Sequence, residues 1–424
     1  MQNHDVTHTY SKNAHSKSAD LREADLGGKY VFLRVDINVP IKDGVVTDAT
    51  RIERIVPTIN LLVAKGAKII LASHFSRPEG VRNEAMSLVQ VLPCLRQALP
   101  DVTIHFVDDC VGEKVKSAAN NLKNGEILLL ENLRFHQGEE NIGQGNGDAS
   151  FAAQLASLAQ YYVNDAFSCS HRPHASISGI AKLLPSYYGL AMQEELSALK
   201  QVFDAPQKPV AALVGGSKVS TKMQLLENLV ETMDVIMIGG GMANTFLYAQ
   251  GHDVGKSLCE PQLQSLALSI LQKAQQNNCR IMLPIDLVVA TKFEQSPACR
   301  VVAIDEISSD EMALDVGTKT VQAWGEAIAE ARTLVWNGPV GAFETAPFDC
   351  ATVSLARIIA SQVAGGELAC VAGGGDTVAA LNHAGLSAQV TYLSTAGGAF
   401  LEWLEGKPLA GVEAIEQQNI KIAS

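Results

Sequence analysis

Arginine, histidine and asparagine gather in four short polar clusters in the first half of the chain. The clusters are RVDINVP, SHFSRP, ENLRF and NDAFSCSHRPHAS, at residues 34–40, 73–78, 131–135 and 164–176. The side chains in and near them that could do chemistry are Asp36, Asn38, Arg51, His74, Arg77, Arg134 and Arg172. Guanidinium groups grip carboxylate and phosphate through paired hydrogen bonds, and the other side chains can hydrogen-bond to a hydroxyl. This set predicts a site for a small, heavily anionic metabolite.

Glycine dominates the corresponding clusters in the second half. These clusters are GGSKVSTK, GGGMANTF, NGPVGAFE, GGGDT and STAGGAF, at residues 215–222, 239–246, 337–344, 373–377 and 394–400. Glycine pairs that open helices leave free backbone N–H groups, which bind phosphate together with the positive end of the helix dipole. We therefore expect a nucleotide here. Lys218 and Lys222 are four residues apart, which predicts that both lie on one helix face and reach the phosphates.

Each of these residues also has a simpler interpretation. A single arginine can be a surface or capping charge, and a single glycine pair can be a tight turn, so the evidence is their recurrence. Cys169 and His171 could suggest a thiolate nucleophile, but a buried inert thiol is the favoured interpretation. His171 and His174 could ligate a metal, yet Asp376 is the better candidate for Mg²⁺, which prefers one carboxylate plus phosphates.

Two motifs are imperfect and exclude familiar classes of protein. GHDVGKS at residues 251–257 has three residues between its glycines where a P-loop needs four, so we interpret it as a loop. GGGMAN has Asn244 where a dinucleotide-binding fingerprint needs a third small residue, and the HRD and DFG motifs of protein kinases are missing. A dehydrogenase that binds NAD at the glycine-rich turns stays open as an alternative, although this missing fingerprint weighs against it.

Short β-branched runs alternate with longer helical stretches from Leu21 onward, which predicts an α/β fold with helices on both faces of parallel sheets. We expect two doubly wound parallel-sheet (Rossmann-like) lobes joined by a helical hinge. The expected strands are 30–35, 68–72, 103–107, 127–130, 161–163, 210–214, 235–238, 280–283, 333–336, 368–372 and 390–393. Ligands of such sheets bind at the carboxyl ends of the strands, where the clusters fall, so each lobe should carry one crevice.

The expected domain boundaries follow from this pattern. Residues 1–20 are polar and predict a disordered extension. An N-terminal lobe spans 21–191 and a C-terminal lobe spans 206–407. A linker helix over 192–205 carries apolar residues at helical spacing, and the tail 408–424 is expected to pack on the N-terminal lobe.

Composition limits the function further. The 424 residues are 47% hydrophobic and 18% charged, which excludes global disorder, and the net charge of −12 argues against nucleic acid or an anionic membrane as partner. The eight cysteines show no Cys-x-x-Cys spacing, so we expect reduced packing residues. Neither a secretory signal nor a long apolar run is evident, which favours a cytoplasmic protein.

Taken together and in this order, the clusters resemble the phosphoglycerate kinase family from about Leu21 to Ala414. The resemblance implies a monomeric, two-lobed glycolytic enzyme that exchanges a phosphoryl group between 1,3-bisphosphoglycerate and ADP, giving 3-phosphoglycerate and MgATP. Mg²⁺ would be held by Asp376. The lobes would close about residues 190–206 and 395–410, since metabolite and nucleotide sit on different lobes.

The resemblance also assigns residues. The substrate site would comprise Asp36, Ile37, Asn38, Arg51, His74, Phe75, Ser76, Arg77, Arg134 and Arg172. The nucleotide site would comprise Gly216, Lys222, Gly240, Asn337, Glu344, Gly374, Gly375, Asp376 and Thr377, with Glu344 accepting from the ribose. The catalytic groups would be Arg51, Lys218, Gly375 and Gly398.

Three residues depart from the family pattern. Ser76 and Ala396 stand where glycine is usual, and Ala410 stands where proline is usual. If either glycine position needs a left-handed backbone, the substitution costs roughly 1–2 kcal/mol. A catalytically silent relative that only binds nucleotide is a further alternative, against which the intact Arg51, Lys218 and Asp376 weigh.

Overall fold

The computed structural model describes residues 20–140, 147–203 and 206–423. The chain divides into two compact units. Unit 1 comprises Met1–Gln193 and Ala410–Ser424, and unit 2 comprises Glu194–Leu409. The predicted extension over residues 1–20 lies, except for Asp20, outside the described residues.

Unit 1 is built on a six-stranded sheet in the order β5-β6-β4-β1-β7-β8. Its strands are β1 (Tyr30–Val35), β4 (Lys68–Ala72), β5 (Ile104–Phe106), β6 (Ile127–Leu129), β7 (Tyr161–Asp165) and β8 (Ser186–Tyr188), and all neighbours pair in parallel. Five of the six residues of β1 are buried, as expected of a central strand covered on both faces. The chain adds strands on one side of β1 first and then returns to add β7 on the other side, so the topological switch point lies between β1 and β7.

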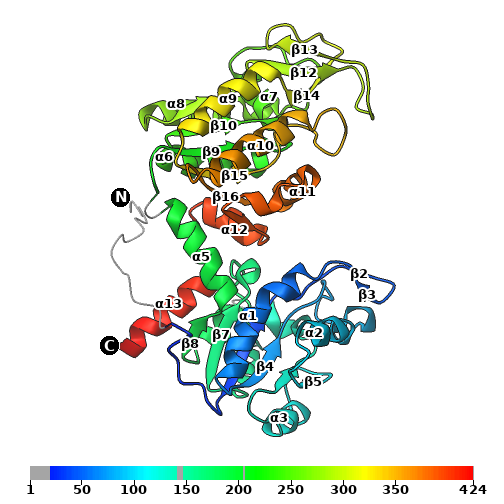
Figure 1. Ribbon diagram of the computed structural model, residues 1–424, viewed down its shortest axis with the longest axis vertical. Helices are drawn as coiled ribbons and strands as arrows, with labels where there is room; N and C mark the ends of the chain where they lie inside the picture. Colours follow the sequence, from blue (N-terminus) through cyan, green and yellow to red (C-terminus); the bar gives the residue numbers. More distant parts are fainter. Residues whose placement is uncertain (1–19, 141–146, 204–205, 424) are drawn as a thin grey trace, which may run out of the picture. The chain divides into compact units, whose positions relative to one another are not determined.

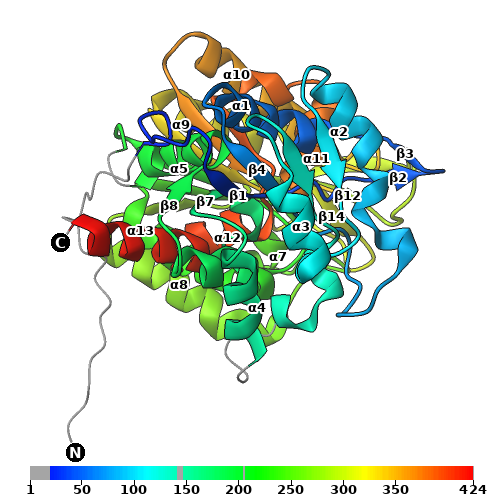
Figure 2. The same cartoon turned by 90° about the horizontal axis from the view of Figure 1, so that it is seen from below.

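The helices of unit 1 surround this sheet in Figures 1 and 2. They are α1 (Thr50–Ala64), α2 (Leu92–Ala98), α3 (Glu113–Asn120), α4 (Gly147–Ala156) and α13 (Ala410–Ala423). The last of these comes from the far end of the chain and lies beside β8. Gly411 N donates to Ser170 O at 2.8 Å, and the Tyr188 hydroxyl donates to Val412 O at 3.2 Å. These bonds fix the C-terminal helix to unit 1.

Unit 2 repeats the plan with the order β11-β10-β9-β15-β16-β17, again all parallel. The strands are β9 (Val210–Val214), β10 (Val235–Ile238), β11 (Arg280–Met282), β15 (Thr333–Asn337), β16 (Ala369–Gly373) and β17 (Tyr392–Ser394). Here the switch point lies between β9 and β15. The helices are α6 (Met223–Thr232), α7 (Gly240–Ala249), α8 (Gln264–Gln276), α9 (Thr318–Glu330), α10 (Cys350–Ala364), α11 (Gly375–Ala384) and α12 (Gly398–Leu404).

The α/β fold class with two parallel sheets is confirmed. Each of the eleven predicted strands is present, with bounds that differ by at most two residues. The helix α5 (Leu190–Phe203) begins two residues before the predicted linker helix, whose last residues 204–205 lie outside the described residues. The motif GHDVGKS forms a loop, as predicted.

Several elements were not predicted. They are β8, the hairpin β2 (Ile41–Lys42) with β3 (Val45–Val46), and an antiparallel sheet in the order β13-β12-β14. This second sheet of unit 2 consists of β12 (Asp286–Ala290), β13 (Cys299–Ala303) and β14 (Met312–Val316). The prediction that all cysteines are packing residues is wrong for Cys299 and Cys350, which are exposed at the starts of β13 and α10. Within the described ranges, no helix has both the length and the apolar character needed to cross a bilayer.

Candidate active site

Asp36 is the centre of the predicted acid site in unit 1. It follows β1 directly, at the switch point of the sheet. Its carboxylate accepts hydrogen bonds from Arg51 Nη1 at 2.7 Å and from the Ser168 hydroxyl at 2.5 Å, and from the backbone of Asn38 at 3.1 Å. Burial opposes its ionisation, but the Arg51 guanidinium and these hydrogen bonds outweigh burial and lower the pKa of Asp36. The carboxylate therefore holds Arg51 in place at the rim of the site.

A second chain of contacts joins the loop after β4 to the loop after β6. The Asn38 side-chain oxygen accepts from Ser76 N at 2.9 Å, and Arg134 Nη1 donates to Ser76 O at 2.8 Å. Arg134 is almost completely buried and also pairs with Glu140, its Nε lying 2.9 Å from Oε1. The Ser76 backbone is left-handed, with φ +57°, so this departure from glycine does fall at a strained position. Ala396 lies outside the left-handed region.

The remaining predicted residues of unit 1 take different positions. The backbone of Ile37 donates to the Ser73 hydroxyl at 3.1 Å. Phe75 is held at both main-chain atoms by the Asn132 side chain, at 3.1 Å and 2.7 Å. Arg172 is half-buried and donates to His171 Nε2 at 3.1 Å, whereas Arg77 is exposed. The structure thus joins Asp36, Asn38, Arg51, Ser76 and Arg134 in one network of hydrogen bonds.

The same region contains residues that sequence reasoning missed. Arg34, Ser73, Asn132 and Ser168 all bond to predicted site residues. Each belongs to one of the four polar clusters, so membership of the clusters was the signal that could have found them.

Among the described residues, Asp36, His74 and Cys169 bring potential metal-ligating atoms within 4.8 Å of one another. Two guanidinium groups lie against this group, because Arg51 bonds to Asp36 and Arg34 bonds to His74. Burial raises the pKa of the Cys169 thiol, so it stays protonated and is a poor ligand and nucleophile. The chemistry of the cluster therefore suits an anion better than a metal ion.

In unit 2, the turns after β9 and β15 meet at the switch point. Gly215 N donates to Asn337 O at 3.0 Å. The buried ammonium group of Lys222 donates to Gly215 O at 2.6 Å and to Asn337 O at 2.9 Å, which ties the two turns together. Burial lowers the pKa of Lys222 to about 8, although the nearby Asp376 carboxylate opposes the shift.

Two glycines in these turns leave no room for a side chain. Gly240, at the start of α7, has φ +66°, and a Cβ there would lie 2.7 Å from Gly216 O. Gly338 has φ +103°, and a Cβ there would lie 2.2 Å from Gly215 O and 2.7 Å from Lys222 Nζ. The close approach of these backbones keeps the N–H groups at the start of α7 near the two turns.

The start of α11 is fixed by two predicted residues. Asn337 Nδ2 and the Thr377 hydroxyl both donate to Gly373 O at 2.8 Å. The Thr377 hydroxyl also accepts from Gly338 N at 2.7 Å. These bonds leave Asp376 exposed in the first turn of α11, with Gly374 at φ +99° before it.

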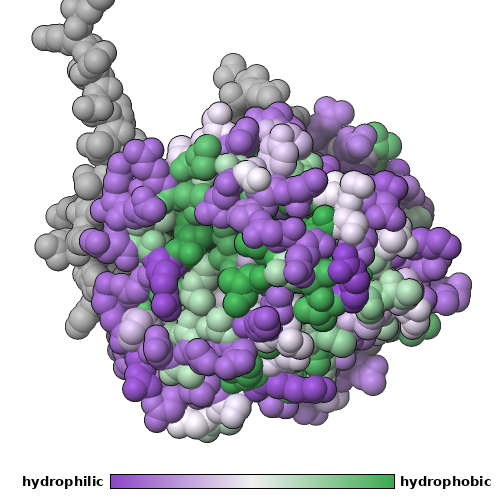
Figure 3. All heavy atoms as spheres, turned by 90° about the horizontal axis from the view of Figure 1, so that it is seen from above, coloured by the Kyte–Doolittle hydropathy of each residue, from purple (hydrophilic) through white to green (hydrophobic). Residues whose placement is uncertain are grey.

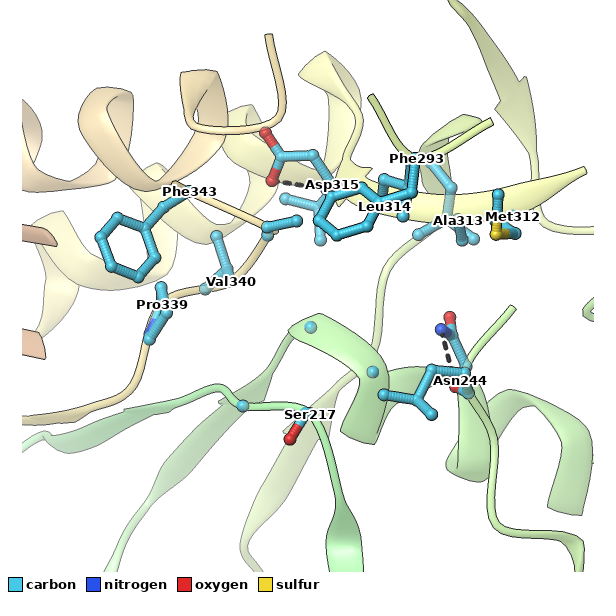
Figure 4. Close-up of a pocket in the computed structure, with 18 of the residues that line it drawn as sticks. Ser217, Asn244, Phe293, Met312, Ala313, Leu314, Asp315, Pro339, Val340 and Phe343 are labelled. Atoms are coloured by element: carbon cyan, nitrogen blue, oxygen red, sulfur yellow. Dashed lines mark hydrogen bonds between the residues drawn. The ribbon is translucent and has the colours of Figure 1, made fainter. Parts of the chain in front are cut away.

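A pocket of about 510 Å³ opens beside these turns. Four predicted nucleotide-site residues line it, namely Gly216, Gly240, Glu344 and Asp376. Figure 4 shows Met312, Ala313 and Leu314 of β14 on one side, Ser217 and Asn244 on the opposite side, and Pro339, Val340 and Phe343 at one end. Most of this lining is apolar, and one wall of it comes from the antiparallel sheet that was not predicted, so that wall was missed.

Exposed apolar side chains of unit 2 partly belong to this pocket. Figure 3 shows hydrophobic residues scattered among hydrophilic ones on the face that it views. Leu258 and Phe293 are 50% and 58% exposed, and both line the pocket. Large apolar side chains that stay exposed beside a concave surface are typical of a binding site.

The prediction that Lys218 and Lys222 share a helix face is wrong. The helix α6 begins at Met223, after both lysines, because Val219–Thr221 form a separate 3₁₀ turn. Lys218 has extended backbone and is exposed, whereas Lys222 is half-buried, with its ammonium group bonded to two backbone carbonyls. Glycines do open α7, α11 and α12, the last two at Gly375 and Gly398, but the pair Gly215-Gly216 opens no helix.

Two parallel sheets, each with a cluster of candidate binding residues at its switch point, define an α/β protein of the doubly wound class. Comparisons with known proteins identify its family. The family model described as phosphoglycerate kinase matches residues 21–407. The chain is 54% identical to a phosphoglycerate kinase of Rhizobium meliloti over 395 residues, 93% of this chain and 98% of that protein. It is 53% identical to one of Brucella abortus over 397 residues, 94% of this chain and 99% of that protein.

Solved structures agree. The structure of phosphoglycerate kinase from Coxiella burnetii matches with a TM-score of 0.86 and 38% identity, covering 94% of this chain and 99% of that one. The enzyme from Pyrococcus horikoshii matches with a TM-score of 0.75 and 28% identity, covering 95% and 99%. The chain therefore belongs to the phosphoglycerate kinase family, which are phosphotransferases with a carboxyl group as acceptor.

Proposed function

We propose that this chain transfers a phosphoryl group reversibly between 1,3-bisphosphoglycerate and ADP, with the acid held by unit 1 and the nucleotide by unit 2. The observation that carries this proposal is the pair of switch-point sites, one rich in guanidinium groups and one rich in glycine. The proposed boundaries are an acid-binding domain over 21–191, a linker over 192–205, and a nucleotide-binding domain over 206–407.

The acid site would recognise charge and shape together. Arg51, Arg134 and Arg172 supply guanidinium groups for the carboxylate and phosphate of 3-phosphoglycerate. Asp36 and Asn38 supply acceptors for its hydroxyl. In the structure Arg51 and Arg134 are paired with Asp36 and Glu140, so the substrate would have to compete with internal carboxylates for them.

The nucleotide site would take the base in the apolar pocket and the phosphates at the glycine-rich turns. Glu344 is exposed at the pocket and would accept from the ribose hydroxyls. Asp376 lines the same pocket in the first turn of α11, and an exposed carboxylate beside a phosphate site is the donor that Mg²⁺ prefers. Asp376 would therefore hold Mg²⁺, which neutralises charge on the polyphosphate when bound.

The transfer would proceed without a general base, because the acceptor carboxylate is already ionised at neutral pH. The protein would position donor and acceptor and stabilise charge on the phosphoryl oxygens through Arg51, Lys218 and the backbone N–H groups at Gly375 and Gly398. Because the acid and nucleotide residues belong to different units, we include hinge closure about residues 190–206 and 395–410 in the proposal. Scattering that records no compaction with both substrates bound would refute this closure.

The deciding experiment is a coupled assay for ATP made from 1,3-bisphosphoglycerate and MgADP. Active enzyme is expected, and Arg51→Ala and Lys218→Ala are each expected to lower kcat by roughly 10²–10³, the usual loss for one preorganised donor. Lys208→Ala is the control, because this exposed lysine pairs with Asp234 away from the pocket lining. Nucleotide binding without ATP formation would support the silent relative, and saturable binding of NAD would support the dehydrogenase.

The expectations of a cytoplasmic, monomeric enzyme that binds neither nucleic acid nor membrane stay predictions. Sedimentation of the purified protein tests the oligomeric state.

A further inference from the structure

Arg34 is a buried arginine beside the acid site that is absent from the predicted site residues. It lies in β1 and is 1% exposed. Its Nε donates to the Ser176 hydroxyl at 2.8 Å, and its Nη1 donates to Val35 O. Its third contact runs from Nη2 to His74 Nδ1, at 3.4 Å. A buried cation thus lies directly against a candidate substrate-binding histidine.

This contact determines where the proton of His74 lies. A guanidinium group has only donors, so the nitrogen that faces it must accept. The Cys169 sulfur lies 3.9 Å from the same Nδ1, and as a protonated thiol it is a second donor to that atom. With Nδ1 accepting, a neutral ring carries its proton on Nε2.

The surroundings also keep the ring neutral. Burial is the main cause that holds the pKa of His74 well below its usual value. The titratable and charged groups that face it are Asp36, which favours the imidazolium, Arg34 and Arg134, which disfavour it, and His174, whose own pKa burial lowers to about 3 so that it is neutral. Burial and the two guanidinium groups outweigh the single carboxylate.

We infer that Arg34 is a positioning residue for the acid site, which holds His74 as the neutral Nε2–H tautomer so that the ring offers the substrate a hydrogen bond without a charge. The inference rests on the proposed function, in which His74 contacts 3-phosphoglycerate. It deepens that proposal, because it divides the recognition of the anion between charged arginines and an uncharged imidazole donor.

Arg34 is itself fixed by a buried acid. The Ser176 hydroxyl that accepts from Arg34 donates in turn to Glu139 Oε1 at 2.6 Å, and Ser176 N donates to Glu139 Oε2 at 3.0 Å. Glu139 is fully buried, and the Tyr162 hydroxyl closes the network by donating to Ser176 O at 2.8 Å. The Glu139 carboxylate is the countercharge that lets the Arg34 guanidinium stay buried in one orientation. A residue that only fills space would not require such a partner.

The test compares Arg34→Gln with Arg34→Lys. Lysine keeps a donor and a charge, whereas the glutamine amide can accept a hydrogen bond from Nδ1–H as well as donate one. The first readout is the protonation of the His74 ring nitrogens in ¹⁵N-correlated NMR spectra of the whole protein between pH 5.5 and 8. We expect a neutral Nε2–H ring in the natural protein and in Arg34→Lys, and in Arg34→Gln mainly the Nδ1–H tautomer, bonded to the amide oxygen, with a higher apparent pKa.

The second readout is kinetic. Loss of the His74 Nε2–H donor should raise KM for 3-phosphoglycerate roughly tenfold in Arg34→Gln while kcat stays within about twofold. Arg34→Lys should recover most of the affinity. Arg96→Gln is the matched control, because Arg96 is an arginine of the same unit whose guanidinium bonds to Ile104 O at 3.0 Å instead. It should leave KM and the His74 spectrum unchanged.

An Nδ1–H or doubly protonated His74 in the natural protein at pH 7 overturns the inference, as does an Arg34→Gln protein with unchanged tautomer and KM. If Arg34→Gln does not fold, the natural protein and Arg34→Lys still decide through the spectrum. The spectrum needs no turnover. A chain that makes no ATP but shows the expected tautomer would therefore refute the proposed function and leave the assignment of the proton intact.

Discussion

Replacing Ser76 by glycine should stabilise unit 1. With φ +57°, Ser76 is held in the left-handed region, which costs a non-glycine residue roughly 1–2 kcal/mol. Glycine removes that strain, but it also gives the unfolded chain more conformational freedom, which lowers the free energy of unfolding by about 0.5–1 kcal/mol. The net gain in the free energy of unfolding is therefore about 0.5–1 kcal/mol, or roughly 2 °C in the melting temperature of a unit of this size.

The matched control is Ala396→Gly, the other position where glycine is usual in the family. Ala396 is buried but lies outside the left-handed region, so glycine there relieves no strain and should cost about 0.5–1 kcal/mol. Urea unfolding and thermal melting of both variants measure the two effects. The described hydrogen bonds of Ser76 are made by its main-chain N and O, so KM for 3-phosphoglycerate should not rise. A less stable Ser76→Gly protein, or stabilisation of equal size in both variants, would refute the strain argument.

Two further predictions concern the turns of unit 2. Gly338→Ala should lower the free energy of unfolding by several kcal/mol and abolish MgADP binding, because the added Cβ would overlap Gly215 O. Gly366→Ala is the control: its φ is +72° but the space around it is open, so thermal melting should record a loss of only about 1 kcal/mol. Lys222, with its pKa lowered from 10.5 to about 8, binds a proton in the unfolded chain but not in the folded chain between those pH values. The stability of the natural protein relative to Lys222→Met should therefore rise with pH across that window, by up to about 3 kcal/mol in urea titrations, and a flat difference would contradict the burial of this ammonium group.

The parallel sheets could be predicted because their strands are buried on both faces and form continuous apolar runs between helical stretches. The run Val210–Val214 is an example, and the strand in the structure has the predicted bounds. The antiparallel sheet β12–β14 was missed because β13 and β14 are partly exposed and polar loops separate the three strands, so the pattern of apolar residues does not mark the sheet as clearly. Since this sheet forms one wall of the pocket, the apolar half of the nucleotide site was missed with it.

Residue identity and spacing also cannot show which side chains touch. Lys218 and Lys222 have helical spacing, but a 3₁₀ turn before α6 leaves Lys218 exposed and Lys222 half-buried. Arg34 lies two residues before Asp36 in the same cluster, but it belongs to the buried strand β1 whereas Asp36 follows the strand, and only the structure shows the contact of Arg34 with His74. The clusters therefore predicted where the candidate sites lie, whereas the contacts within each site could be seen only in the structure.

The two proposed sites would bind anions by different physical means. In unit 1, Arg51 and Arg134 are paired with Asp36 and Glu140, so an incoming anion would gain only the difference between its own contacts and the internal ones. In unit 2, the groups at the turns are main-chain N–H groups and one ammonium group, which is bonded to backbone carbonyls. An incoming polyphosphate would therefore not have to displace a carboxylate from that ammonium group. Binding of the acid should consequently depend on its geometry more than on its total charge. An anion that cannot displace the carboxylates from Arg51 and Arg134 would form no ion pair with these two arginines. That dependence gives a reason for an uncharged donor at His74, which adds an orienting hydrogen bond without adding another cation that would need a carboxylate partner.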